Sequence, residues 1–384
     1  MSVYNLRLFF IFCYFLLPHH LTFFFDGQWP LFKPTDVICV LLLLLIPKRF
    51  NKNPIIILYF LFFLIYLYFG LLNYADITSL FVSVKLFQYL VVILNITAIR
   101  VNHLINIFKV ILIFTVCTFV LFLLGFDIGP YWGQRFFSVY GGPYELAAIA
   151  VFSIIFLRRA SILQNRRKHS FFYFVFLMFS KSKSGLLSVL VSRKRYIVGC
   201  LFILVILLDS VEFTNYESRL FHILSDFAVF FNADVISECA NLPSFSSKAE
   251  YHRLFLLREV NSTIESLSAS SSHRFVTTCT VLGSFDAWSL LFGFGPYVVG
   301  TVDNSVLRIL SDVGLLGLIL FFVFFCKLTP NWTLAERSAL LVTFLLADVF
   351  FSARVIPYFY LCYLLNLRFR SLRIVPEGKI RRAG

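Results

Sequence analysis

The chain has 384 residues, of which 59% are hydrophobic and 14% charged, and its mean hydropathy is +0.85. This composition excludes a soluble globular domain and indicates a polytopic membrane protein. The apolar residues form solid runs, whereas a transmembrane barrel needs alternating ones, so we expect an all-α fold. A net charge of +14 would suggest nucleic acid in a soluble protein, but here it is better explained by cationic cytoplasmic loops.

The apolar runs predict about twelve transmembrane helices in a single membrane domain, residues 1–384. No small-x-small cleavage site follows the first run, so we expect it to be retained as a span. The runs 170–181 and 184–192 are too short to cross the bilayer fully. About a dozen residues rise less than about 20 Å in a helix, whereas the hydrocarbon core is about 30 Å thick. The predicted spans are 7–25, 31–47, 54–72, 77–99, 104–124, 143–157, 170–181, 184–192, 196–209, 305–326, 333–352 and 355–367.

The distribution of charge gives these spans one orientation. With the amino terminus in the cytoplasm, most Lys and Arg residues of the short loops and of the tail are cytoplasmic. Nearly every Asp and Glu then lies at or beyond the outer boundary, apart from Glu336, Glu377 and Asp348. We therefore expect both termini in the cytoplasm and one large loop, residues 210–304, outside it.

The large loop is the most informative segment. It lies in a polar stretch that holds about half of all Asp and Glu residues, and it contains the string Leu-Phe-Gly-Phe-Gly-Pro (291–296). A transporter rarely needs such a loop, whereas an enzyme can close it over a substrate whose lipid tail stays in the bilayer. Cys239 and Cys279 lie in the loop and either form a disulfide or remain two thiols. No Cys-x-x-Cys or Walker-type sequence indicates metal or ATP.

Four cations gather on the outer side in this topology: Arg135, Lys183, Arg274 and Arg308. Charge in or near the membrane is costly, so each of these residues is a candidate for function. An Arg fork or a Lys point charge can bind the phosphate oxygens of a lipid diphosphate. The alternative role for each of them is an interfacial anchor or a structural ion pair.

Two acids are candidates for the general base that transfer of a sugar to a hydroxyl requires. Asp303 stands beside Asn304 at the outer mouth of the span 305–326, where the alternative role is that of a helix N-cap. Glu145 follows Pro143 at the start of another span, and it either pairs with a cation or acts as the base.

Three patterns, in this order, resemble the O-antigen polymerase family, whose architecture O-antigen ligases share. The first is Gly133, Arg135, Gly142 and Pro143 before a span; the second is the turn Ser182-Lys183-Ser184-Gly185 between the short spans; the third is Arg274, Gly293, Gly295, Asp303-Asn304, Gly314 and Gly317. The likeness covers about residues 125–325, in topology more than in identity. Lys183 departs from the usual Arg of the family, and Glu145 from the usual Asn.

The resemblance implies a membrane glycosyltransferase at the periplasmic face of the bacterial inner membrane. It would polymerise oligosaccharide repeat units linked to undecaprenyl diphosphate into O-antigen or capsular polysaccharide, without metal, cofactor or nucleotide sugar. Its partners would be the lipid-linked repeat units, the membrane, a chain-length regulator and a flippase, and no nucleic acid. Ligases typically have His where this chain has Asp303, which favours the polymerase. The alternatives are a ligase that transfers glycan to lipid A core and a lipid-linked oligosaccharide flippase.

Overall fold

The computed structural model describes residues 2–18, 23–25, 29–47, 53–72, 77–126, 136, 138, 140, 143–159, 166–180, 182, 185, 188–189, 277–296, 304–352 and 354–373. In these ranges the chain forms helices and one short hairpin. The elements are α1 (Val3–Leu16), β1 (Phe23–Phe25), β2 (Trp29–Phe32), α2 (Pro34–Leu43), α3 (Pro54–Leu72), α4 (Ile77–Thr97), α5 (Val101–Leu123), α6 (Pro143–Arg159), α7 (Arg166–Phe179), α14 (Ala287–Phe292), α15 (Ser305–Leu328), α16 (Leu334–Leu346) and α17 (Val355–Arg373).

Most of the long helices agree with the predicted spans. α3 has the predicted bounds, and α4, α5, α6, α7, α15 and α17 each begin within about one turn of the predicted start. In the part of the chain that the structure describes, α3, α5 and α15 are long and apolar enough to cross a membrane. Shorter apolar helices accompany them, which is compatible with a multi-pass membrane protein. The predicted span 196–209 and most of 184–192 lie outside the described residues.

Several predicted bounds are wrong: the span expected over 31–47 is a helix only over Pro34–Leu43, and α17 continues past the predicted end at 367 to Arg373. The helix expected over 7–25 ends at Leu16, because Leu17 precedes Pro18 and takes an extended conformation (φ −67°, ψ 135°). Phe23–Phe25 then pairs antiparallel with Trp29–Phe32, as aromatic runs favour. The span expected over 333–352 ends as a helix at Leu346. The all-α prediction therefore holds for the long elements and missed this hairpin.

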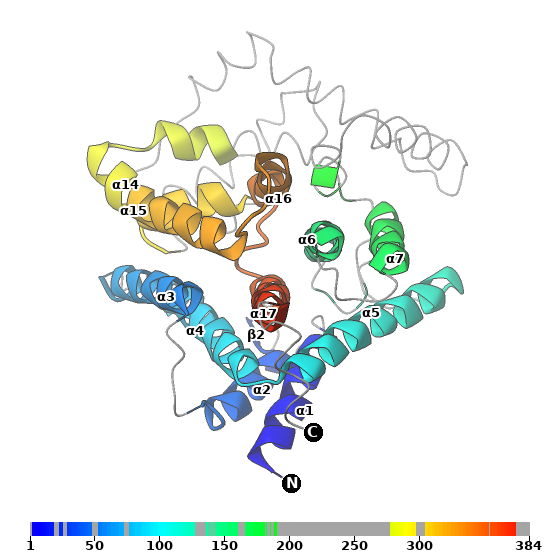
Figure 1. Ribbon diagram of the computed structural model, residues 1–384. Coiled ribbons are helices and arrows are strands. Elements are labelled where there is room, and N and C mark those ends of the chain that lie inside the picture. Colours follow the sequence, from blue (N-terminus) through cyan, green and yellow to red (C-terminus); the bar gives the residue numbers. More distant parts are fainter. Residues whose placement is uncertain are drawn as a thin grey trace.

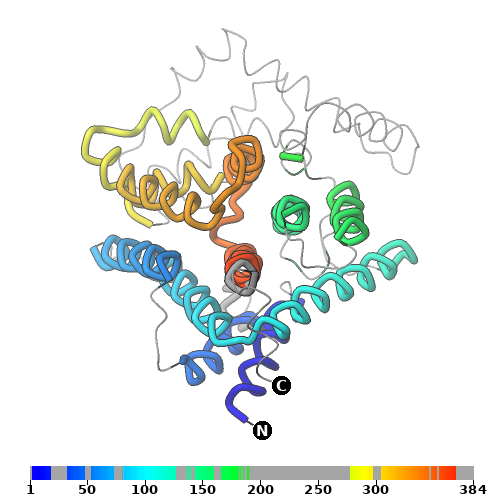
Figure 2. Tube along the Cα trace, viewed as in Figure 1, coloured from blue at the N-terminus to red at the C-terminus, as the bar shows by residue number. Residues whose placement is uncertain are grey.

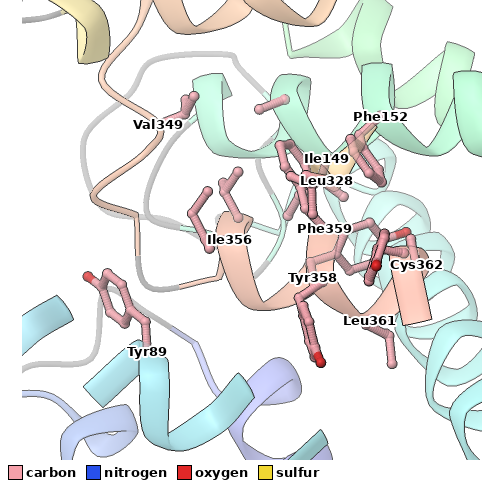
Figure 3. Packing of buried hydrophobic residues seen from close by; sticks show 14 of the residues in the cluster. Tyr89, Ile149, Phe152, Leu328, Val349, Ile356, Tyr358, Phe359, Leu361 and Cys362 are labelled. Carbon is pink, nitrogen blue, oxygen red and sulfur yellow. The ribbon is translucent and has the colours of Figure 1, made fainter. Parts of the chain in front are cut away.

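The centre of the core is α17. Its hydrophobic side chains from Val355 to Leu365 are at most 7% exposed, so the helix is buried on every side. Figure 1 and Figure 2 show α17 between α4 and α5 below and α6 above, and it packs against all three. Phe359 stacks on Phe152 of α6 with ring centroids 4.0 Å apart, and Tyr358 shares a hydrogen bond with Ser153 of the same helix. Figure 3 shows this packing from close by.

Arginines join the helix termini at one end of the bundle. Arg7 of α1 donates to the carbonyl of Leu45 after α2 (2.6 Å), and Arg368 of α17 donates to carbonyls at the end of α4. Arg159 at the end of α6 forms an ion pair with Glu336 at the start of α16. These contacts bring together the first turns of α1 and α16 and the last turns of α2, α4, α6 and α17. The last turns of α1 and α16 and the first turns of α2, α4, α6 and α17 therefore lie at the opposite end of the bundle.

Two glycines bring the end of the large loop directly against α15. Gly314 interrupts the helical conformation of α15 (φ 68°, ψ −163°), and a Cβ there would lie 2.3 Å from the backbone of α14. A Cβ on Gly293 would lie 2.5 Å from the backbone of Asp312. The N–H of Gly295 donates to the carbonyl of Asp312 at 3.1 Å. Close approach of two backbones explains why glycines stand at positions 293 and 314.

We expect Gly314→Ala to destabilise the protein more than Gly125→Ala does. Both glycines have a positive φ, which costs a residue with a Cβ about 1–2 kcal/mol, but a Cβ on Gly125 would meet nothing within 4 Å. The contact with α14 should add roughly 1–3 kcal/mol at Gly314. Thermal unfolding of the detergent-solubilised variants measures the difference. Equal losses would contradict the direct packing of α14 on α15.

Candidate functional site

The α16–α17 connection (residues 347–354, of which 353 lies outside the described residues) is non-helical and largely buried. Buried backbone N–H and C=O groups need hydrogen-bond partners. Ser305, the first residue of α15, supplies several of them. Its Oγ accepts from the N–H groups of Val349 (2.8 Å) and Phe350 (3.0 Å) and lies 3.1 Å from the carbonyl oxygen of Ala347, to which it donates.

Tyr89 of α4 supports the same connection from the other side. Its hydroxyl donates to the carbonyl of Phe351 at 2.7 Å. Figure 3 shows Val349 on the connection and Tyr89 on the helix beneath it. Within the connection, the N–H of Ser352 donates to the carbonyl of Val349 at 3.2 Å. The start of α15 and the middle of α4 therefore fix the path of this buried segment.

One group of charges, the Arg308 cluster, comprises Arg308, Asp312, Asp348, Tyr66 and Phe351. Arg308 is 7% exposed; its Nη1 is ion-paired with Asp348, and its Nε lies 3.7 Å from Oδ2 of Asp312. The guanidinium lies 4.1 Å from the ring centroid of Phe351, a cation–π distance. The hydroxyl of Tyr66 donates to Asp312 at 3.3 Å. One buried cation is thus held between two carboxylates.

A second group, the Glu145 cluster, comprises Lys33, Asp36, Lys85, Glu145 and Arg354. Lys85 Nζ lies 2.5 Å from Oδ1 of Asp36. Lys33 interacts electrostatically with Glu145, Lys85, Asp36 and Arg354, and Arg354 interacts in turn with Glu145. Arg354 is completely buried. Three cations and two carboxylates from four parts of the chain therefore share one charged region.

Secondary structure explains how the residues of the Glu145 cluster meet. Asp36 lies in the first turn of α2, where it accepts the N–H of Lys33 at 2.9 Å, and Pro34 occupies the first helical position. Glu145 lies in the first turn of α6, where the helix dipole favours a carboxylate. Arg354 directly precedes α17. Three helix starts thus converge at the end of the bundle opposite to the Arg159–Glu336 pair.

Buried tyrosines surround the guanidinium of Arg354. Its Cζ lies 5.9 Å from the ring centroid of Tyr140, which is 2% exposed, and it also interacts electrostatically with Tyr14. Aromatic faces stabilise a cation that burial removes from water. The Glu145 cluster is therefore enclosed by protein on the Arg354 side.

Two of the site residues predicted from the sequence lie in the described part of the chain. Arg308 occupies an ion pair, which was the alternative to diphosphate binding. Glu145 lies among cations, which was the alternative to a role as base. The predicted residues Asp303, Arg135, Lys183 and Arg274 lie outside the described residues.

Asn304 fills the N-cap position of α15. Its Oδ1 accepts the N–H groups of Val306 and Leu307, both at 3.0 Å. A cap with two bonds satisfies the donors that a helix start exposes. The alternative considered for Asp303, that of capping this helix, is therefore taken by the next residue.

The turn that contains Ser182 and Gly185 packs tightly on α6 and α7. Ser182 is 5% exposed, and a Cβ on Gly185 would lie 2.8 Å from the Cβ of Ala147 in α6. The N–H of Phe136 donates to the carbonyl of Phe179, the last residue of α7, at 3.1 Å. Phe136 and Ser182, the described neighbours of Arg135 and Lys183 in the chain, thus belong to segments that meet at the end of α7.

Sequence patterns alone give no site role to five of the clustered residues, which are Lys33, Asp36, Lys85, Asp348 and Arg354. A signal existed, since charged residues inside or between apolar runs are candidates by default. Their partners were not readable from the sequence, because Arg308 and Asp348 lie 40 residues apart and Lys33 and Arg354 lie much further apart.

Cys279 is disulfide-bonded, and its predicted partner Cys239 lies outside the described residues. Farther along, Asp286 accepts hydrogen bonds from the side chain and N–H of Ser289, which lower the pKa of its carboxyl group. Among the described residues, no three His, Cys, Asp or Glu side chains are placed to hold a metal ion.

We expect Arg308→Met to lower the free energy of unfolding by about 3–5 kcal/mol, because it leaves Asp312 and Asp348 buried without their cation. Combining it with Asp348→Asn should recover part of this loss, with a coupling energy of about 1–3 kcal/mol. Lys327→Gln, at an exposed site of the same helix, is the control with little expected effect. Thermal unfolding in detergent measures all of these variants, and strictly additive losses would contradict the pairing.

No family model, curated protein or solved structure matches this chain. The O-antigen polymerase family therefore remains a resemblance carried by three short patterns.

Proposed function

We propose that this chain is a membrane glycosyltransferase that polymerises undecaprenyl-diphosphate-linked oligosaccharide repeat units. The growing glycan leaves one undecaprenyl diphosphate and joins the distal sugar of another lipid-linked repeat unit. The reaction takes place at the periplasmic face of the bacterial inner membrane, and the product is O-antigen or capsular polysaccharide.

The observation that carries the proposal is the concentration of buried charge at one end of the helix bundle. The Arg308 cluster and the Glu145 cluster lie at the helix ends opposite to those joined by Arg7, Arg159 and Arg368. The end of the large loop packs on α15 beside Asp312, which belongs to the Arg308 cluster. An enzyme that acts on a diphosphate lipid needs charges at headgroup depth and a loop to cover them.

The length of α16 supports a site below the outer surface. Its 13 residues rise about 20 Å, which is less than the roughly 30 Å of a hydrocarbon core. In a membrane, the α16–α17 connection would therefore lie within the bilayer depth, where irregular backbone is tolerated when protein buries it. The buried hydrogen bonds of Ser305 and Tyr89 meet this requirement.

The residues have distinct proposed roles. Arg135, Lys183 and Arg274 bind the diphosphates, and Asp303 is the base, since Asn304 already caps α15. Arg308 is neutralised by two carboxylates, so we assign it a structural charge in place of diphosphate binding.

We assign Glu145 a positioning role in the same site. It stabilises the positive charges of Lys33 and Arg354, which face it from the starts of α2 and α17. A nearby carboxylate lowers the cost of keeping positive charge inside an apolar bundle. Lys33 and Arg354 then contribute to a positive field at the outer end of the helices.

In the proposed reaction, an acceptor hydroxyl oxygen bonds to the anomeric carbon of the donor sugar. The bond between that carbon and the diphosphate oxygen breaks, and undecaprenyl diphosphate leaves. Asp303 takes the hydroxyl proton, and the positive charges of Arg135, Lys183 and Arg274 stabilise the charge that develops on the leaving group.

The surface glycan of a strain lacking this gene tests the assignment. A gel that shows core with a single repeat unit in place of the ladder supports a polymerase. Loss of all capped core, with long polymer accumulating on the lipid carrier, would indicate the ligase. Accumulation of unpolymerised lipid-linked repeat units on the cytoplasmic side would indicate the flippase.

Arg135→Ala and Arg274→Ala should each abolish chain growth while the protein stays in the membrane, because the diphosphate loses a charge partner that the surroundings cannot replace. Arg100→Ala removes an exposed arginine from the predicted cytoplasmic side and should leave the ladder unchanged. Complementation of the deletion strain followed by a glycan gel reads out all three variants. Wild-type polymer lengths from the Arg135 and Arg274 variants would reject the diphosphate role.

Asp303→Asn should lower the polymerisation rate about a hundredfold or more, since the amide cannot take a proton. Its thermal stability should match that of the wild type. The matched control is Asn304→Asp, which still caps α15 and should keep both rate and stability. Assay of the purified variants on lipid-linked repeat units measures the rates. Near-normal turnover by the Asp303 variant would exclude it as the base.

A further inference from the structure

A cavity of about 400 Å³ lies where the end of α6 meets the start of α7, away from both charged clusters. Figure 1 shows these two helices side by side, and they pack against each other. The cavity is lined by Ile154, Leu157, Arg158, Arg166, Arg167, Ser170, Phe171, Phe174 and Val189. Three of these side chains are guanidinium groups, one is a hydroxyl and the rest are apolar.

The polar part of the cavity suits a phosphate group. Arg158 ends α6, and Arg166 and Arg167 begin α7, so the partial positive charge of the α7 N-terminus adds to three full charges. The described residues of the lining include no carboxylate, and the sequence has no Asp or Glu between Glu145 and Asp209. Arginine forks bind phosphate oxygens in pairs, and a hydroxyl at Ser170 can add a further donor.

The apolar part identifies the class of ligand. Ile154 and Leu157 form a buried wall, while Phe171 is 62% exposed and opens the cavity to the side of α7. A soluble phosphate compound has no apolar part that could pack against these surfaces. A phospholipid does, since its phosphate is joined to acyl chains that run along the helices, and basic pockets between transmembrane helices bind anionic headgroups in this way.

We propose that this cavity binds an anionic glycerophospholipid, with Arg158, Arg166 and Arg167 on its phosphate and the apolar residues along its acyl chains. The site lies at the end of the bundle that the charge distribution predicts to be cytoplasmic, opposite to the proposed catalytic region. Lipid binding there does not depend on the proposed glycosyltransferase activity. The lipid-binding proposal can therefore be tested separately from that activity.

The test is native mass spectrometry of the purified full-length protein with equal amounts of phosphatidylglycerol and phosphatidylcholine of identical acyl chains. We expect wild type to retain phosphatidylglycerol in preference, and Arg166→Gln/Arg167→Gln to reduce that preference about tenfold or more. Both arginines are exposed, so the double variant should keep the wild-type unfolding temperature. An unchanged preference in this variant would overturn the proposal.

A charge-matched control separates a built site from general attraction to cations. Lys109→Gln/Lys168→Gln removes two exposed positive charges from the same region without touching the cavity lining, and it should keep the preference. An equal loss in this control would show that net charge alone retains the lipid. Displacement of the lipid by millimolar glycerol 3-phosphate would show that a soluble phosphate is the true ligand, which would also overturn the proposal.

Discussion

The structure depends on satisfying a stretch of non-helical backbone inside a tightly packed helix bundle. The α16–α17 connection is buried, and each of its polar backbone groups that lacks a partner would cost about 1–3 kcal/mol. Ser305 bonds two N–H groups and one carbonyl of this connection, and Tyr89 bonds another carbonyl. Side chains from α15 and α4 thus satisfy the backbone at the point where α16 ends and before α17 begins.

The buried charges follow from the same arrangement. The connection carries Asp348 toward Arg308 and Arg354 toward Glu145, so a single irregular segment contributes to both clusters. A helix continued through these residues would point the two side chains elsewhere on its surface. Isolated charges in an apolar bundle are strongly destabilising, whereas paired ones are tolerated. The connection therefore lets this bundle keep ionised groups at helix depth.

Local patterns predicted the helices well and the contacts between them poorly. The apolar run of α3 gave both of its bounds, and the apolar run from Ser305 gave the start of α15, although its N-cap is Asn304 and not Asp303, the candidate considered from the sequence. The end of α16 was missed because most of residues 347–352 are apolar like the helix before them, and the contacts that favour a break there come from Ser305 and Tyr89, which are distant in sequence. The position of Glu145 indicated a paired carboxylate. Its partners Lys33 and Arg354 come from distant parts of the chain, which no single-sequence pattern brings together.

The contact between the loop end and α15 has a consequence for movement. Phe294 and Gly295 donate to the carbonyls of Ser311 and Asp312, next to the interruption at Gly314, while the carboxylate of Asp312 faces Arg308. Lifting residues 293–295 would leave the carbonyls of Ser311 and Asp312 without these two donors at the point where Gly314 already interrupts the helix. The backbone that receives the loop and the side chain that contacts Arg308 thus belong to the same turn of α15, so the loop docks on the segment that carries a buried ion pair.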